Sequence, residues 1–411
     1  MTARSESSSP PAEGDRTALA VALGLIVLTI SWGLLHVGFW HRNQIIDTPL
    51  YQEFATKILD GEVPYRDFPV EYPPAALPVF VLPGLAESER YGSAFELLMW
   101  ACAVAAIVFV ATALARVGAS GPRLYAAVAF FGLAPLALGS VVLTRFDFWP
   151  AALAAAALAA LVGGRDRLGF GLLGLATAAK LYPGVLLPLA FVWVGRRRGW
   201  REAGIALALF LGVLLAVFLP FVVLSPGGVW DSLTNQLGRP LQIESLGAAL
   251  LLAGRQLGLY DPTVVSTHGS QNLDGGLPDV LATVQTALQL VALLAVWIVF
   301  SRGRSDPERL LAGSAAAVAA FVAFGKVLSP QFLIWLLPLV PLVGGGVGLA
   351  AGAVFTAALV ATQAWFPHRY WDVVALEPAG WLVLVRDVLL LALFAVLLAA
   401  TRRGSAEPRS A

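Results

Sequence analysis

The residues with the clearest chemical potential lie between Asp47 and Pro74, in the stretch DTPLYQEFATKILDGEVPYRDFPVEYPP. This stretch carries six carboxylates against two cations: Asp47, Glu53, Asp60, Glu62, Asp67 and Glu71, with Lys57 and Arg66. A carboxylate beside a reacting hydroxyl acts as a general base and removes its proton. Asp47 follows the first apolar segment closely and is well anchored for this role, and Glu71 is the alternative base. The competing interpretations are a solvated loop carboxylate for Asp47 and, for Glu71, a structural partner of Arg66 or of an interfacial lysine.

Two lysines at the ends of short apolar segments are the second chemical feature. Lys180 lies near Pro183, and Lys326 lies near Pro330. A lysine is a compact point charge that suits a lipid phosphate, so both are candidates for binding an anionic leaving group. Snorkelling of each lysine to the lipid headgroups is the competing interpretation.

A short polar corner contains Arg145 and Asp147, which flank Phe146. The two charged side chains could pair with each other or with a neighbouring group. We expect a structural role for Asp147, and the role of Arg145 is left open by the sequence.

Further charged residues lie towards the C-terminus. His368 and Arg369 could contact a phosphate or a headgroup, although their aromatic neighbours are also typical of a membrane-interface belt. Arg386 and Asp387 lie inside an apolar segment, where a functional charge and a structural ion pair are both reasonable interpretations. The sequence shows no histidine and carboxylate cluster spaced for a metal, and Cys102 is the only cysteine. We therefore expect no metal and no cofactor.

The composition places these residues in a polytopic membrane protein. Hydrophobic residues make up 58% of the 411 residues and charged residues only 13%, and the apolar residues come in long runs. This is too apolar for a single soluble core and predicts an all-α membrane protein. The formal net charge of +1 indicates no particular partner, and we expect no nucleic acid.

The apolar runs predict about 12 membrane-spanning helices, since about 20 apolar residues cross a bilayer. They are expected at residues 17–40, 93–116, 124–143, 148–162, 202–224, 279–300, 310–324, 332–343, 347–365 and 380–400, with two more between Arg167 and Arg196. A single helix in that last interval would place Lys180 near the middle of the membrane, at a cost of roughly 2.5 to 3.5 kcal/mol. Two short helices that meet at Lys180 avoid this cost.

These spans form one expected domain, residues 17–400, between a disordered tail (1–16) and a basic tail (401–411). Two large loops interrupt the domain. The first outer loop (41–92) should carry a short interfacial helix at 75–85, and the second outer loop (225–278) an amphipathic helix at 245–257.

The distribution of arginines orients the chain, because cytoplasmic loops carry an excess of positive charge. The arginines expected on one side are Arg4, Arg16, Arg116, Arg123, Arg165, Arg167, Arg196, Arg197, Arg198, Arg201, Arg302, Arg304, Arg309, Arg402, Arg403 and Arg409. Both termini should then be cytoplasmic, in the plasma membrane. Both large loops and the corners at Arg145, Lys180, Lys326 and His368 should face outside. No nucleotide sugar or ATP is available there, so any activated donor would have to arrive on a lipid.

The outer-face residues resemble those of glycosyltransferase family 87 (DUF2029). The similar motifs are Asp47 with Leu50-Tyr51, Gly61-x-x-Pro64-Tyr65, Glu71-Tyr72-Pro73-Pro74, Arg145-Phe146-Asp147, Ala179-Lys180-Leu181-Tyr182-Pro183, and Lys326-Val327-Leu328-Ser329-Pro330-Gln331 leading to Trp335 and Pro338. They occur in the family's order and cover about Asp47 to Pro341.

The resemblance implies a GT-C fold and an α-mannosyltransferase that uses polyprenyl-phosphate mannose. The donor would be a polyprenyl-phosphate sugar and the acceptor a glycolipid or lipoglycan. Membrane lipids would surround the protein and both substrates. The resemblance implies that Asp47 is the catalytic aspartate. The substrate-binding candidates are Tyr51, Tyr72, Arg145, Lys180, Tyr182, Lys326, Gln331, His368 and Arg369.

Two other classes of protein fit the hydrophobic pattern. A transporter or lipid flippase also has about 12 spans with broken helices, but the unusual charges gather at one face and no repeat relates the two halves. A non-catalytic subunit of an envelope assembly would explain the hydrophobicity but not the carboxylates of the first outer loop.

Overall fold

The computed structural model describes residues 13–42 and 44–403, and these residues are mostly helical. The predicted all-α membrane fold is therefore confirmed in its main feature. The expected tail at 1–12, the residues from 404 onwards, and Arg4 and Arg409 with them, lie outside the described residues. Residues 13–16, which were expected to belong to the tail, already form the first turn of a helix.

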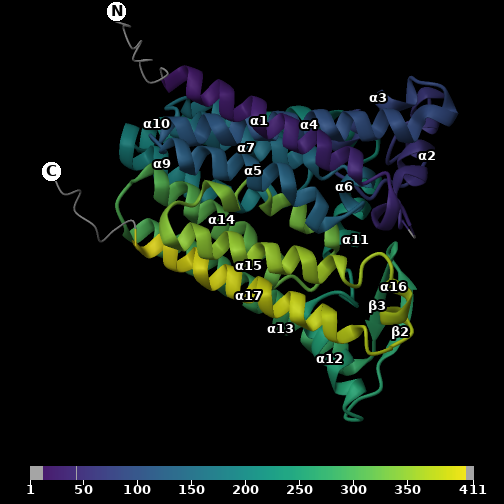
Figure 1. Cartoon of the computed structure of the whole chain (residues 1–411). Coiled ribbons are helices and arrows are strands. Elements are labelled where there is room, and N and C mark those ends of the chain that lie inside the picture. Colours follow the sequence, from purple (N-terminus) through teal and green to yellow (C-terminus); the bar gives the residue numbers. More distant parts are fainter. Residues whose placement is uncertain (1–12, 43, 404–411) are drawn as a thin grey trace, which may run out of the picture.

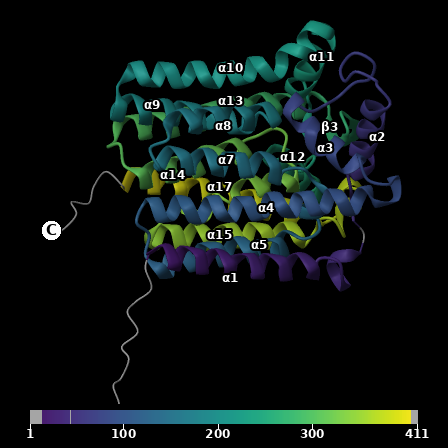
Figure 2. The same ribbon diagram turned by 90° about the horizontal axis from the view of Figure 1, so that it is seen from above.

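Within the described residues, seven helices are long and apolar enough to cross a membrane. They are α1 (Glu13–Leu34), α4 (Tyr91–Arg116), α5 (Gly121–Leu138), α10 (Trp200–Leu224), α13 (Gly276–Arg302), α15 (Gly345–Gln363) and α17 (Gly380–Arg403). Four shorter helices are α7 (Phe148–Val162), α8 (Asp166–Ala179), α9 (Leu187–Arg198) and α14 (Pro307–Ala323). The helices run side by side along one direction (Figures 1 and 2).

The helix break predicted at Lys180 is present. Helix α8 ends at Ala179, Lys180 is extended, and the short 3₁₀ helix η4 (Tyr182–Leu186) leads into α9. Pro183 in the first turn of η4 has no amide hydrogen and restricts the residue before it, which favours a new helix start over continuation of α8. Two short segments therefore replace one long span here.

The predicted α-helix at 332–343 is wrong in type. The chain forms two 3₁₀ helices there, η5 (Pro330–Leu336) and η6 (Val340–Leu342). Pro338 and Pro341 each remove a backbone donor and disrupt a regular α-helix. Most of the segment is buried, and irregular backbone at membrane depth is tolerated when protein surrounds it.

One end of the bundle, which we call the arginine end, holds the start of α1 and the end of α17 (Figure 1). Arg123 at the start of α5 forms two hydrogen bonds with Glu308 of α14, at 2.5 and 2.7 Å. The Nε of Arg309 donates to the carbonyl of Thr401 in α17, at 2.9 Å. These contacts join helix ends that are far apart in sequence, so arginines of the predicted set gather at one end.

The opposite end, the hairpin end, is built from short elements (Figures 1 and 2). Its helices are η1 (Gly38–His41), α2 (Thr48–Leu59), η2 (Pro74–Ala76), α3 (Leu77–Gly84), η3 (Ser88–Arg90), α6 (Val141–Thr144), α11 (Pro226–Leu237), α12 (Leu246–Gln256) and α16 (Tyr370–Val374). Helices α3 and α12 match the two short helices predicted for the outer loops. Helices α2 and α11 are additional to the prediction.

A small antiparallel sheet at the hairpin end was not predicted. It contains β1 (Leu241–Gln242), β2 (Thr263–Thr267) and β3 (Ser270–Asp274) in the order β1-β3-β2. His268 and Gly269 connect β2 to β3 with φ values of 52° and 64°, which fits a two-residue hairpin turn. The second outer loop is thus a folded layer rather than a loop with one helix.

The two outer loops contact each other directly. The hydroxyl of Ser225 donates to the carbonyl of Tyr65 at 2.9 Å. A Cβ at Gly228 would lie 1.8 Å from the same carbonyl, so this close approach requires glycine. The contact brings residues of both loops to the same end of the bundle.

Candidate active site

A cavity of about 450 Å³ lies at the hairpin end. It draws its lining from both outer loops, from the corners after α6 and α8, and from the segment after α14. The polar and charged residues that line it are Asp47, Glu71, Tyr72, Arg145, Lys180, Tyr182, Ser232, Gln236, Arg239, Gln242, Glu244, His268, Ser270, Thr286, Gln289, Lys326, Ser329, Gln331 and Tyr370. Most of the site residues predicted from the sequence are therefore brought together.

Asp47 precedes α2 and faces the cavity beside Arg145. Its carboxylate forms an ion pair with the Arg145 guanidinium, and its side chain remains 30% exposed. The Arg145 side chain is nearly enclosed and also donates to the carbonyl of Ile45 at 3.3 Å. Burial lowers the pKa of Arg145 to about 10, opposed by the negative charges of Asp147 and Glu244. Arg145 therefore fixes the position of an accessible carboxylate.

Lys180 has a carboxylate partner inside the protein. Its Nζ donates to Oδ1 of Asp147 at 2.5 Å, and the Nε1 of Trp335 donates to the same oxygen at 2.5 Å. Asp147 is fully buried, and the ring of Tyr182 stacks on Trp335 with centroids 4.1 Å apart. Burial lowers the pKa of Lys180, opposed by the charge of Asp147. The Lys180 charge is thus already compensated by Asp147, which has the structural role expected of it.

Two other cations line the cavity without an ion pair to any carboxylate of the described residues. The Nζ of Lys326 donates only to the carbonyl of Leu237, at 3.0 Å. The guanidinium of Arg239 donates to Ser270 at 2.8 Å and to Gln236 at 3.4 Å, and its Nε has no partner there. Burial lowers the pKa of both cations. Their charges are available to an anionic ligand.

A buried carboxyl lies on the second outer loop. Glu244 is 2% exposed, and its Oε2 accepts a hydrogen bond from the Gln242 amide. Its backbone carbonyl accepts from Arg386 of α17 at 2.6 Å. Burial raises the pKa of Glu244 to about 7, opposed by the positive charges of Arg386 and Arg145.

Arg386 and Asp387 lie next to this carboxyl. The Nε of Arg386 donates to Oδ1 of Asp387 at 2.6 Å, and both side chains are fully buried. Their arrangement matches the structural ion pair that was one of the two interpretations of these residues.

The second predicted base, Glu71, has a different setting from Asp47. It is exposed and lies near the hairpin turn, where a Cβ at Gly269 would be 3.5 Å from its Oε1. Arg66 pairs with Asp67 at 2.8 Å instead of with Glu71. Glu71 therefore lies at the mouth of the cavity.

The remaining predicted residues divide into two groups. Tyr72, Tyr182 and Gln331 line the cavity, and burial raises the pKa of Tyr72. Tyr51 is enclosed beneath it, where its hydroxyl donates to Oδ2 of Asp47 at 3.4 Å and therefore supports that carboxylate.

His368 and Arg369 do not line the cavity. The ring of His368 packs against Phe39 with centroids 4.2 Å apart, and Arg369 pairs with Asp372 at 3.2 Å. His368 thus has an aromatic contact and Arg369 an ion pair, both outside the cavity.

The sequence interpretation did not identify Arg239, Gln242, Glu244 or Tyr370, all of which line the cavity. The first three lie in the second outer loop and outside every motif that suggested a family. One usable signal was present, because Gln242 and Glu244 alternate with the buried Leu241 and Ile243 in a short extended pattern.

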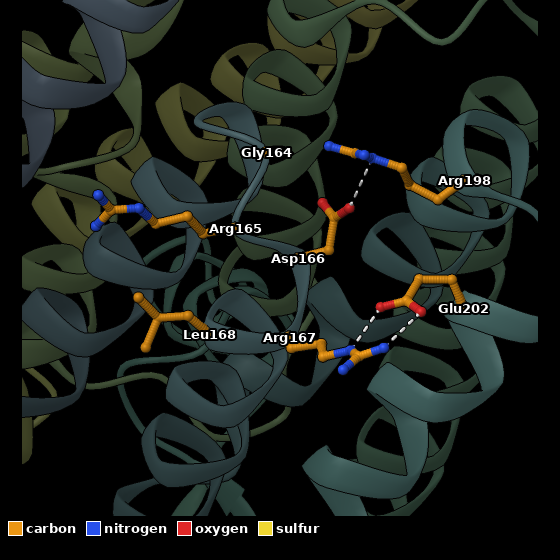
Figure 3. Close-up of a pocket in the computed structure, with 7 residues that line it drawn as sticks. All are labelled: Gly164, Arg165, Asp166, Arg167, Leu168, Arg198 and Glu202. Atoms are coloured by element: carbon orange, nitrogen blue, oxygen red, sulfur yellow. Dashed lines mark hydrogen bonds and ion pairs between the residues drawn. The ribbon is translucent and has the colours of Figure 1, made fainter.

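A second pocket lies at the arginine end of the bundle (Figure 3). It has a volume of about 560 Å³ and is more open than the cavity at the hairpin end. Its two carboxylates are paired, Glu202 with Arg167 at 2.7 Å and Asp166 with Arg198 at 3.5 Å (Figure 3). These pairs connect α8, α9 and α10, which accounts for the cluster without a ligand. The candidate active site is therefore the cavity at the hairpin end.

Among the described residues, no group of three or more histidine, cysteine or carboxylate side chains is placed to hold a metal ion. The polar groups of the cavity instead comprise carboxylates, cations and amides from separate segments. This combination suits a ligand with both hydroxyl groups and an anionic group.

In a comparison with known protein families, the chain matches glycosyltransferase family 87 over residues 70–330. The matched region is more than half of the chain and includes Arg145, Lys180, Arg239, Glu244 and Lys326. Asp47 lies before it. None of the curated proteins searched matches the chain.

Proposed function

The chain belongs to glycosyltransferase family 87, and from this premise we propose that it transfers a hexose from a polyprenyl phosphate to a hydroxyl group of a glycolipid or lipoglycan. Mannose is the expected sugar, and the reaction takes place at the outer face of the membrane. The observation that carries the proposal is one cavity that is lined by an accessible carboxylate, Asp47, and by two cations, Arg239 and Lys326, that form no ion pair with any described residue.

Asp47 is the proposed general base. The acceptor oxygen attacks the anomeric carbon of the donor sugar, and Asp47 takes the hydroxyl proton. The bond between that carbon and the phosphate oxygen breaks, and the phosphate leaves with the electron pair. Attack from the face opposite the phosphate inverts the configuration, so a β-linked donor gives an α-linked product without a covalent sugar–enzyme intermediate. The ion pair with Arg145 holds the carboxylate in position.

Lys326 and Arg239 are the proposed partners of the leaving phosphate. A charge-assisted hydrogen bond from each cation stabilises the negative charge that develops on the phosphate oxygens. Lys180 was predicted for the same role together with Lys326, but its ammonium already binds Asp147. We therefore propose that Lys180 supports the cavity wall and that Arg239 takes its place at the phosphate.

The proposed orientation follows from the arrangement of charge. The arginine end faces the cytoplasm, because positively charged loops stay on that side. The cavity then opens on the outer face of the plasma membrane, where a lipid-linked donor supplies its own leaving group. Both tails are cytoplasmic in this orientation.

The test is transfer of a labelled sugar from polyprenyl-phosphate mannose to a panel of glycolipids by purified protein. Asp47→Asn keeps the size of the side chain but cannot take a proton, so transfer should fall about 100-fold or more. Folding and donor binding should survive.

Glu71→Gln is the matched control and should lose much less activity, because Glu71 lies at the cavity mouth. Near-normal transfer by Asp47→Asn together with collapse in Glu71→Gln would assign the base to Glu71. Normal transfer in both variants would remove the base from the first outer loop.

A further inference from the structure

Gln242 and Glu244 are two buried polar residues of the cavity that the proposed reaction does not yet use. They are 4% and 2% exposed, and both line the cavity. The amide nitrogen of Gln242 donates to Oε2 of Glu244, so the side chains lie side by side. The Gln242 amide oxygen is enclosed without a partner, and Oε1 of Glu244 accepts no hydrogen bond from the described residues. A buried acceptor normally has a donor, so the Gln242 amide oxygen lacks one, and Oε1 of Glu244 can accept a second hydrogen bond beside it.

The backbone around the pair is fixed by hydrogen bonds to three other segments. The amide of Gln242 donates to the carbonyl of Lys326 at 3.0 Å, and the amide of Ile243 donates to the carbonyl of Gln271 at 3.0 Å. Arg386 donates to the carbonyl of Glu244 at 2.6 Å. The backbone that carries the two side chains is therefore held in place before any ligand binds.

The pair lines the same cavity as both parts of the proposed reaction centre. Its backbone is bonded to Lys326, a proposed phosphate partner. The charge of Glu244 interacts with Arg145, which pairs with the proposed base Asp47. In the reaction, the group between the leaving phosphate and the attacking hydroxyl is the donor sugar.

We propose that Gln242 and Glu244 bind two neighbouring hydroxyl groups of the transferred sugar and so determine which hexose the site accepts. This inference rests on the proposed function. A vicinal diol supplies two adjacent donors, one for the amide oxygen of Gln242 and one for Oε1 of Glu244, and a carboxylate forms strong hydrogen bonds with hydroxyl groups. A site built to bind a hydroxyl rejects an analogue without it, because its own polar groups are then left unpaired.

The variants Glu244→Gln and Gln242→Leu test the inference with two ligands. Each should lower the kcat/KM for polyprenyl-phosphate mannose at least tenfold. Each should leave unchanged the inhibition by polyprenyl phosphate, which has the phosphate and the lipid but no sugar. The matched control Lys326→Ala should weaken both ligands. Equal weakening of both ligands by Glu244→Gln or Gln242→Leu, or no weakening of either, would overturn the inference.

Donors whose sugar lacks one hydroxyl group give a second readout, the discrimination against the incomplete sugar. A purely structural role of the pair would not change this discrimination. Wild-type protein should discriminate strongly against donors that lack either hydroxyl bound by the pair, and both variants should lose most of this discrimination. Discrimination unchanged in both variants would overturn the inference even if one of them is poorly folded. If wild-type protein transfers no sugar from any polyprenyl phosphate, the proposed function itself fails. Transfer by wild type with unaltered sugar selectivity in the variants overturns only the role of the pair.

Discussion

At the scale of single residues, side chains in similar sequence motifs differ in their ionic partners and therefore in their roles. Lys180 and Lys326 occur in similar settings near proline, yet Lys180 binds Asp147, whereas Lys326 binds only a backbone carbonyl in the part of the chain that the structure describes. Arg145 and Asp147 flank one residue, yet they point to different partners, Asp47 and Lys180. Partners this far apart in the chain depend on the fold, which is why the sequence could name these residues but not their pairs.

The buried carboxyl of Glu244 makes stability depend on pH. Its pKa rises from 4.5 to about 7 on folding because burial disfavours the charged form. Between these values the folded protein binds more protons than the unfolded chain, so the free energy of unfolding falls as the pH rises. The destabilisation is complete above about pH 7 and absent below about pH 4.5, and it is on the order of a few kcal/mol.

Thermal unfolding of wild type and Glu244→Gln across this pH range measures the effect. The wild-type Tm should fall relative to the variant as the pH rises from about 4.5 to about 7. Glu62→Gln, which changes an exposed carboxylate, should follow wild type. Parallel curves for wild type and Glu244→Gln would show that burial does not perturb this carboxyl.

At the scale of elements, periodicity and the cost of charge predicted the spans well and the hairpin end poorly. The break at Lys180 followed from the cost of a lysine at mid-membrane, and α8 and α9 confirm it. Strand β1 has only two residues, and β2 and β3 carry mostly polar side chains, so the alternation from Leu241 to Glu244 was too short to predict a sheet. Gln242 lies in β1 and Glu244 two residues after it, so both residues were missed with the sheet.

Lys180 lies at the break between α8 and η4, and its ion pair with Asp147 connects this break to the start of α7. Lys180→Met would leave the buried Asp147 without a cation, at a cost of about 3–5 kcal/mol. Adding Asp147→Asn should recover much of this stability, because the uncompensated charge is removed. Lys326→Met should barely change stability and should lower donor kcat/KM about tenfold.

Thermal unfolding and donor kinetics of wild type, Lys180→Met, the double variant Lys180→Met with Asp147→Asn, and Lys326→Met distinguish a structural lysine from a phosphate-binding one. If Lys180→Met keeps wild-type stability and loses only donor affinity, Lys180 binds the donor phosphate. A strong loss of stability in Lys326→Met would instead make Lys326 a structural residue.

At the scale of the whole molecule, the two charged pockets lie at opposite ends of the bundle. The charged pocket of Figure 3 lies at the arginine end, and the cavity lies at the hairpin end. A transporter site is expected near the midplane, between repeats. The position of the cavity and the membership in glycosyltransferase family 87 both favour the enzyme over a transporter, a flippase or an assembly subunit.

The orientation of the two ends gives the last prediction. Cys102 is the only cysteine and is buried in α4, so Cys102→Ala provides a background without thiols. Glu62→Cys and Thr267→Cys place exposed thiols at the hairpin end, and Ser120→Cys places one in the turn between α4 and α5 at the arginine end. A thiol reagent that does not cross the membrane should label the first two in intact cells. It should label Ser120→Cys only after the cells are opened, because the arginine-rich turns stay in the cytoplasm.

The opposite pattern, with Ser120→Cys labelled and the other two protected, would show that the cavity faces the cytoplasm. Nucleotide sugars are available there, so the need for a lipid-linked donor would disappear, while the family, the cavity and its ion pairs would stand.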